Sequence, residues 1–155
     1  MDIENQNATE KIEVDNEKPE TTVWTAGAVF LGLALFLNCA ITYPLSVLLL
    51  IVKPERMDDV YGEETVARSI LACMYLAIAL VSTLAMVVGA TKRNIQKALQ
   101  LAVPLFTVQI IYKIATAFAV GLQGKNPVII ANLGVVVVQV ITLALNRKDV
   151  ALVFF

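Results

Sequence analysis

The sequence predicts an all-α integral membrane protein, a four-transmembrane-helix bundle whose helices run up-down-up-down. Of the 155 residues, 58% are hydrophobic and 16% are charged, whereas a soluble domain carries about 25% charged residues. The apolar residues gather in four runs, each of roughly the twenty residues that a helix needs to cross a bilayer. Lipid offers no partners to backbone polar groups, so each run is expected to be helical. The chain therefore has room for one membrane domain, over residues 23–146.

The chain begins with a polar segment, residues 1–22, that is rich in Asp and Glu and has no apolar periodicity. This composition predicts a disordered acidic tail. The segment lacks the basic start and the short apolar stretch of a signal peptide.

The first apolar run predicts a helix over about 24–52, with Trp24 as an anchor at the membrane interface. Pro44 is expected to kink this helix, because proline lacks an N–H and its ring clashes with the preceding turn. A weakly polar stripe recurs every four residues along the run, at Asn38, Thr42 and Ser46.

Residues 53–68 form the one substantial loop, and they contain several acidic side chains. Clustered carboxylates suit hard cations, but the alternating spacing and the glycine of an EF-hand are absent. The sequence therefore predicts a solvated loop and no metal site.

The second and third runs predict helices over about 69–90 and 98–122, joined by a short basic link. A link this short requires the two helices to be antiparallel neighbours. Tyr75 and Ser82 are spaced by seven on one face of the second helix, and Pro104 is expected to kink the third.

The fourth run predicts a helix over about 127–145, and residues 147–155 then form a short tail. Amide side chains occur at heptad spacing along this run, at Asn132, Gln139 and Asn146. The chain ends in Val153, Phe154 and Phe155. These residues are either a C-terminal signal for a peptide-binding partner or apolar side chains that dip into the membrane interface.

Lys113 lies near the middle of the third run, and it is the strongest functional candidate in the sequence. A charge at that depth costs a few kcal/mol or more unless it finds a polar partner or water. The four runs contain no Asp or Glu, so its partners must be amides, hydroxyls or backbone carbonyls. We expect an intramembrane polar layer made of Lys113, Gln109, Tyr112, Thr116, Asn38, Ser82, Asn132 and Gln139.

The sequence leaves three functions open for this layer. The first is a structural hydrogen-bond network. The second is a binding site where Lys113 meets an anion, a lipid headgroup or a partner's carboxylate. The third is a path for a small solute or proton. The chain has no histidine, which excludes Ser/His/Asp and Cys/His catalytic sets, and it has no nucleotide-binding glycine motif. We therefore predict a protein that is not an enzyme and has no cofactor. No basic patch interleaved with aromatic residues points to nucleic acid.

The distribution of Lys and Arg predicts that both termini are cytosolic. The two tails and the second link carry seven Lys and Arg residues, against four on the opposite side, and the basic side is cytoplasmic. The endoplasmic reticulum and the plasma membrane both remain open as locations.

A charged loop after the first span is followed by Val66-Ala67-Arg68-Ser69 at the start of the second. This layout resembles small four-span membrane families, namely the DoxX-like proteins and the scaffold family of sterol C-4 demethylation. The resemblance implies a non-catalytic scaffold. We predict a membrane scaffold or accessory subunit that forms a homo-oligomer or a hetero-membrane complex. The alternative is a small transporter or channel subunit that functions as an oligomer.

Overall fold

The computed structural model describes residues 25–92, 95–120 and 127–154. The acidic tail, most of the turn between the third and fourth runs, and Phe155 therefore lie outside the described residues.

The described part of the chain is helical and contains no strand. Its elements in order are α1 (Ala26–Val47), a π-helical segment (Leu48–Val52), a 3₁₀ turn (Glu55–Met57), α2 (Asp58–Tyr61), α3 (Val66–Lys92), α4 (Ile95–Val120), α5 (Pro127–Leu145) and α6 (Arg147–Phe154). Four helices are long and apolar enough to cross a membrane: α1 with its π-helical extension, α3, α4 and α5. The prediction of an all-helical chain with four such helices is confirmed.

The first long helix has defined ends. Thr25 precedes it in an extended conformation, and its hydroxyl accepts a hydrogen bond from the Ala28 N–H at 3.3 Å, as expected of an N-cap. The α-helix continues through Pro44 to Val47, and the backbone then adopts π geometry. Lys53 ends the segment in the left-handed region at φ 47°. The proline that follows disfavours the right-handed helical conformation at Lys53, so the helix does not continue.

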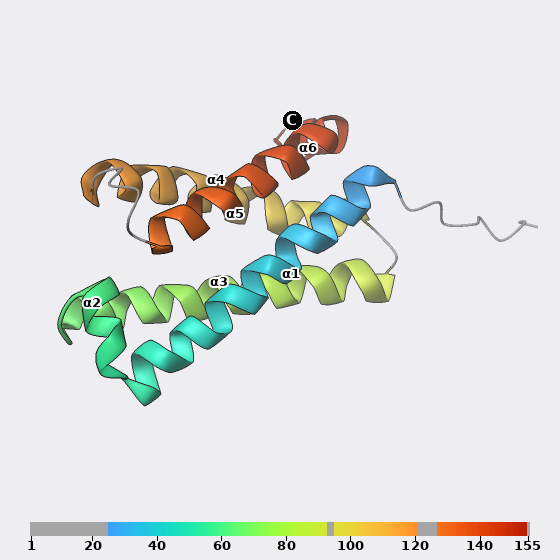
Figure 1. Cartoon of the computed structure of the whole chain (residues 1–155). Helices are drawn as coiled ribbons and strands as arrows, with labels where there is room; N and C mark the ends of the chain where they lie inside the picture. Colours follow the sequence, from blue (N-terminus) through green and yellow to red (C-terminus); the bar gives the residue numbers. More distant parts are fainter. Residues whose placement is uncertain (1–24, 93–94, 121–126, 155) are drawn as a thin grey trace, which may run out of the picture.

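The four long helices pack around a shared interior (Figure 1). α1 lies against α3 and α5, and α4 also lies against α3 and α5. The end of α1, all of α2, the start of α3, the end of α4 and the start of α5 lie together at the left of Figure 1. The short helix α6 lies at the opposite end and packs back onto α4.

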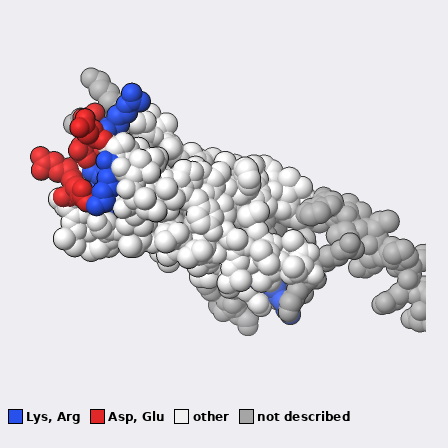
Figure 2. All heavy atoms as spheres, turned by 90° about the horizontal axis from the view of Figure 1, so that it is seen from below, with Lys and Arg blue, Asp and Glu red and all other residues white. Residues whose placement is uncertain are grey.

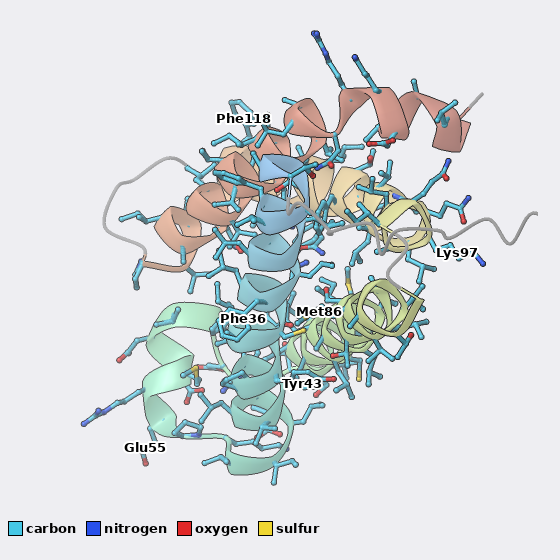
Figure 3. The ribbon with its side chains drawn as sticks, turned by 90° about the vertical axis from the view of Figure 1, so that its right-hand side faces the viewer. Phe36, Tyr43, Glu55, Met86, Lys97 and Phe118 are labelled. Atoms are coloured by element: carbon cyan, nitrogen blue, oxygen red, sulfur yellow. The ribbon has the colours of Figure 1, made fainter. Side chains whose placement is uncertain are left out.

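The outer surface of the helices is apolar. Phe36 and Phe118, labelled in Figure 3, are 57% and 74% exposed. Buried polar side chains lie instead between the helices. An apolar exterior around a partly polar interior suits contact with lipid.

Charged side chains gather at one end of the molecule. Figure 2 shows one face, with Lys, Arg, Asp and Glu clustered at the end that residues 53–68 form, an uncharged middle, and a small basic patch near the opposite end. This distribution suits a charged loop outside the bilayer and an apolar stretch within it.

Candidate functional site

Four polar side chains, one from each long helix, join in a continuous hydrogen-bonded chain. Asn38 of α1 donates from Nδ2 to the Ser82 hydroxyl of α3 at 3.2 Å. Gln139 of α5 donates from Nε2 to Asn38 Oδ1 at 3.3 Å and to Gln109 Oε1 of α4 at 2.9 Å. All four residues are at most 2% exposed. We refer to Asn38, Ser82, Gln109 and Gln139 as the amide layer.

The amide layer links the helices at one depth. A hydrogen bond between membrane helices contributes about 0.6 kcal/mol on average, and up to about 1.7 kcal/mol. Gln109 Nε2 and Gln139 Oε1 have no partner within the described segments. The layer is therefore a specific but modest source of stability, and it fixes which faces of the four helices meet.

A second set of polar contacts joins α5 to the start of α1. Asn146 donates from Nδ2 to the Gly27 carbonyl at 3.1 Å and to the Thr142 carbonyl at 2.8 Å. The Thr142 hydroxyl contacts the Phe30 carbonyl at 3.2 Å and the Val138 carbonyl at 2.7 Å. The sequence analysis did not select Thr142. The available signal was its position, three residues after Gln139 and four before Asn146, since residues at these spacings share a helix face.

Lys113 lies outside the amide layer and pairs with a single amide. It is 3% exposed, and its ammonium donates to Asn132 Oδ1 at 2.5 Å. The nitrogen is also 5.5 Å from the ring centroid of Tyr112, a distance that allows a cation–π attraction. Lys113 lies roughly 10 Å before the end of α4, at about 1.5 Å per residue. The lysine is therefore displaced from mid-span toward the end that carries α2.

A cavity of about 340 Å³ opens beside this lysine. Lys113 and Asn132 line it together with residues of α1, α2, α3 and α5, among them Thr42, Pro44, Tyr61, Tyr75 and Pro127. Two of the long helices contribute its apolar wall, through Ile41, Leu45, Val128 and Ala131. We refer to this space as the lysine cavity.

Two tyrosines close the lysine cavity on the side of the charged loop. The rings of Tyr61 and Tyr75 meet edge to face, with their centroids 6.4 Å apart. The Tyr61 hydroxyl is buried and has no hydrogen-bond partner among the residues that the structure describes. Burial, followed by the neighbouring Tyr75, raises the pKa of Tyr61 above its ordinary value. Tyr61 therefore keeps its proton at neutral pH and is available as a donor.

The eight residues expected in one layer do not all lie together. Four form the amide layer, and Lys113 pairs with Asn132 at the cavity. Thr116 is exposed, and its hydroxyl donates to the Tyr112 carbonyl of its own helix at 2.8 Å. The Tyr112 hydroxyl is buried without a partner within the described part of the chain.

The remaining candidates are placed as follows. Pro44 lines the lysine cavity, and Pro104 lies inside α4, which continues past it to Val120. Val153 and Phe154 belong to α6, but their side chains, like all of Phe155, lie outside what the structure describes.

The start of α3 contains a buried arginine that the sequence analysis noted only as part of a resemblance. Arg68 is 5% exposed, donates from Nη1 to the Gly62 carbonyl at 2.9 Å, and forms an ion pair with Asp58. Lys53 and Glu64 form a second, exposed ion pair. These contacts fold the loop over the end of the bundle. No group of three His, Cys, Asp or Glu side chains suited to a metal occurs in the described ranges.

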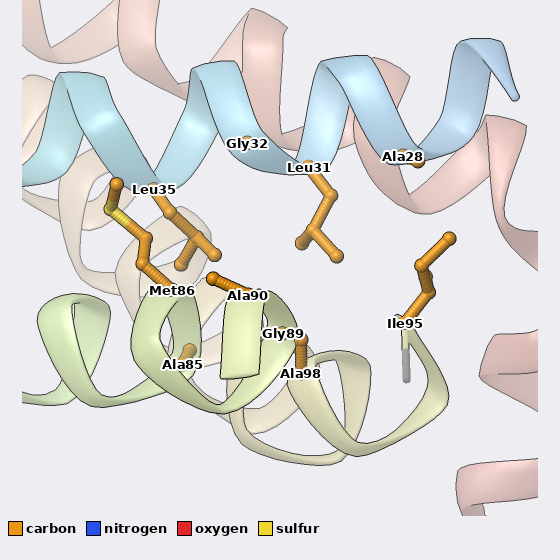
Figure 4. Close-up of a pocket in the computed structure, with 10 residues that line it drawn as sticks. All are labelled: Ala28, Leu31, Gly32, Leu35, Ala85, Met86, Gly89, Ala90, Ile95 and Ala98. Atoms are coloured by element: carbon orange, nitrogen blue, oxygen red, sulfur yellow. The ribbon is translucent and has the colours of Figure 1, made fainter. Parts of the chain in front are cut away.

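A second pocket, of about 250 Å³, lies near the other end of the bundle between α1, α3 and α4 (Figure 4). Leu31 and Leu35 point from α1 toward α3, and Met86, Ala90 and Ile95 border the space. Gly32 also lines it, and a methyl group added there would meet no atom within 4 Å. The described residues that line it all have apolar side chains or none.

A scan against protein-family models, a search of curated proteins and a search of solved structures each found no match to this chain.

Proposed function

We propose that this protein is a non-enzymatic scaffold or accessory subunit of a membrane complex, acting through its helix surfaces and its tails. The amide layer is the observation that carries this proposal. Its side chains bond to one another across all four helices, and such a network fixes helix register. A bundle of fixed register presents a constant outer surface to a partner.

The proposal includes an arrangement in the membrane. The four long helices cross the bilayer up-down-up-down with both termini in the cytosol, and residues 53–68 lie on the other side. The excess of Lys and Arg on the tails and the second link supports this orientation. The resemblance in layout to the DoxX-like and sterol C-4 demethylation scaffold families supports a scaffolding role by analogy.

Affinity purification of the full chain from native membranes tests the scaffold role. In a mild uncharged detergent, we expect a second membrane protein, or further copies of this chain, to co-purify in fixed stoichiometry. Gln139→Leu should reduce this association, because it removes two hydrogen bonds of the amide layer. Thr116→Val is the matched control, since the Thr116 hydroxyl bonds only within its own helix. A chain that always purifies as a lone monomer contradicts the proposal.

A small transporter or channel subunit is the second candidate, and the lysine cavity favours it. A buried lysine beside a partly open space of about 340 Å³ is a feature of substrate paths in transporters. Four spans enclose little volume, so this function requires an oligomer. Solute or proton flux into liposomes that Lys113→Met abolishes would replace the scaffold proposal with this one.

A further inference from the structure

The described residues that line the lysine cavity include one cation, Lys113, and no Asp or Glu. The spans contain no Asp or Glu. Near Tyr61 in the chain, Asp58 pairs with Arg68 and Glu64 with Lys53, while Asp59 and Glu63 are exposed and do not line the cavity. Among the described residues, Lys113 donates to the amide oxygen of Asn132 and lies near the ring of Tyr112, and neither group carries a negative charge. Burying an ammonium without a counter-charge costs free energy, because the surroundings replace little of the hydration that the group has in water. A bound anion removes that cost.

Hydrogen-bond donors remain available around this space. An ammonium has three N–H donors, and the structure assigns Asn132 as the hydrogen-bond partner of Lys113. Tyr61 lines the same cavity next to Tyr75, and its hydroxyl is buried without a hydrogen bond of normal geometry to any described residue. Two donors from different helices therefore converge on one space, which is the arrangement that fixes the orientation of an anionic group.

The rest of the cavity wall suits a hydrocarbon chain. Leu45 of α1 and Val128 and Ala131 of α5 give it an apolar surface. Its volume of about 340 Å³ lies at the lower end of the range for small-molecule sites, roughly 300–1,000 Å³. This space accommodates a small headgroup and the first part of one chain, and the remainder of that chain would extend into the bilayer.

We propose that the lysine cavity binds a single-chain lipid with a terminal carboxylate, such as a long-chain fatty acid. Lys113 neutralises the carboxylate and Tyr61 donates a hydrogen bond to it. One lysine matches one negative charge, which favours a carboxylate over a phosphate monoester of higher charge. This binding does not depend on the scaffold role, because the amide layer and the lysine cavity share none of their polar side chains.

Binding of radiolabelled oleate to the purified full chain in dodecyl maltoside tests the proposal. We expect one oleate per chain, with oleyl alcohol at least about tenfold weaker, because it lacks the charge that pairs with the ammonium. This comparison uses the unmodified chain, so it does not depend on whether a variant folds. Absence of oleate binding, or equal binding of the alcohol, would overturn the proposal.

Variants then assign the contacts. Lys113→Met should weaken oleate binding by about tenfold or more, and Tyr61→Phe by about three- to tenfold. Ala131→Phe should weaken it by filling the cavity while leaving both donors in place. Thr116→Val, on the same helix but outside the cavity lining, should bind as the unmodified chain does. Unchanged binding in Lys113→Met overturns the site, and tighter binding of lysophosphatidate than of oleate overturns the carboxylate assignment.

Discussion

At the scale of single residues, Gln139 joins three of the long helices. Its one amide nitrogen donates to Asn38 of α1 and to Gln109 of α4, so three helices meet at one side chain. Gln139 is 0% exposed, and neither water nor lipid headgroups can replace its hydrogen bonds. If the Gln139 amide were removed, its two acceptors, Asn38 Oδ1 and Gln109 Oε1, would be left unpaired in a low-dielectric interior.

Gln139→Leu should therefore lower the free energy of unfolding by about 1–3 kcal/mol. Leucine has a similar size, so the effect reports the lost hydrogen bonds and not a cavity. Unfolding in mixed micelles with increasing dodecyl sulfate measures the change. Thr116→Val provides the comparison and should change stability by less than about 0.5 kcal/mol. Equal effects of the two substitutions would show that the amide layer contributes nothing.

Gly27 allows the close approach of α1 and α5. A methyl group added at Gly27 would lie 2.4 Å from Asn146 Oδ1, so Gly27→Ala must displace the Asn146 amide from its partners. We expect a loss of roughly 1–3 kcal/mol in the same unfolding assay. Gly32→Ala is the control, because its added methyl meets nothing within 4 Å. That change should stabilise the helix by up to about 1 kcal/mol, and a loss of similar size in both variants would contradict the packing role.

At the scale of elements, two ion pairs hold the loop between α1 and α3, and they differ in burial. The Arg68 side chain is 3% exposed and that of Lys53 is 43% exposed. Exposed ion pairs contribute about 0–1 kcal/mol. Arg68 in addition donates to the Gly62 carbonyl, so it connects the end of α2 to the start of α3.

Arg68→Met should release α2 without unfolding the bundle. We expect the amide protons of residues 57–62 to exchange roughly tenfold faster, because local opening no longer breaks the two Arg68 contacts. Hydrogen–deuterium exchange with mass spectrometry measures this rate. Lys53→Met removes the exposed pair and should leave the same rates within about threefold. If the two variants behave alike, Arg68 does not hold α2 in place.

The sequence was sufficient to predict the four long helices, but it predicts only part of the contacts between them. Apolar run lengths predict the four long helices. The heptad spacing of Gln139 and Asn146 was visible in the sequence, and both side chains are buried, Gln139 in α5 and Asn146 directly after it. The partner of each side chain depends on how far neighbouring helices are offset along their axes. The sequence of one helix does not determine that offset. Thr116 illustrates this limit: it shares the α4 face of Gln109 but is exposed. Similarly, Lys113 is separated from the amide layer because its neighbour at that depth is Asn132.

At the scale of the whole molecule, charged side chains are separated from an apolar surface that suits contact with lipid. The described acids lie in residues 55–64, apart from Asp149 in α6. The exposed side chains of the long helices are largely apolar. A bilayer that covers this apolar surface leaves the loop on one side and α6 on the other.

Cysteine labelling in sealed vesicles tests this arrangement and its orientation together. In a chain without its two native cysteines, Glu55→Cys and Lys148→Cys, both at exposed positions, should react with a membrane-impermeant maleimide from opposite sides. Lys148→Cys should react from the cytosolic side, because Lys and Arg predominate there. A separate chain that keeps Cys73 as its one cysteine tests the depth of α3. Cys73 is exposed in the isolated chain, but it lies roughly 10 Å into α3 at about 1.5 Å per residue. It should therefore stay unlabelled until detergent removes the lipid. Reaction of both introduced cysteines from one side would contradict three intervening spans, and reaction of Cys73 in intact vesicles would contradict the burial of α3 in the bilayer.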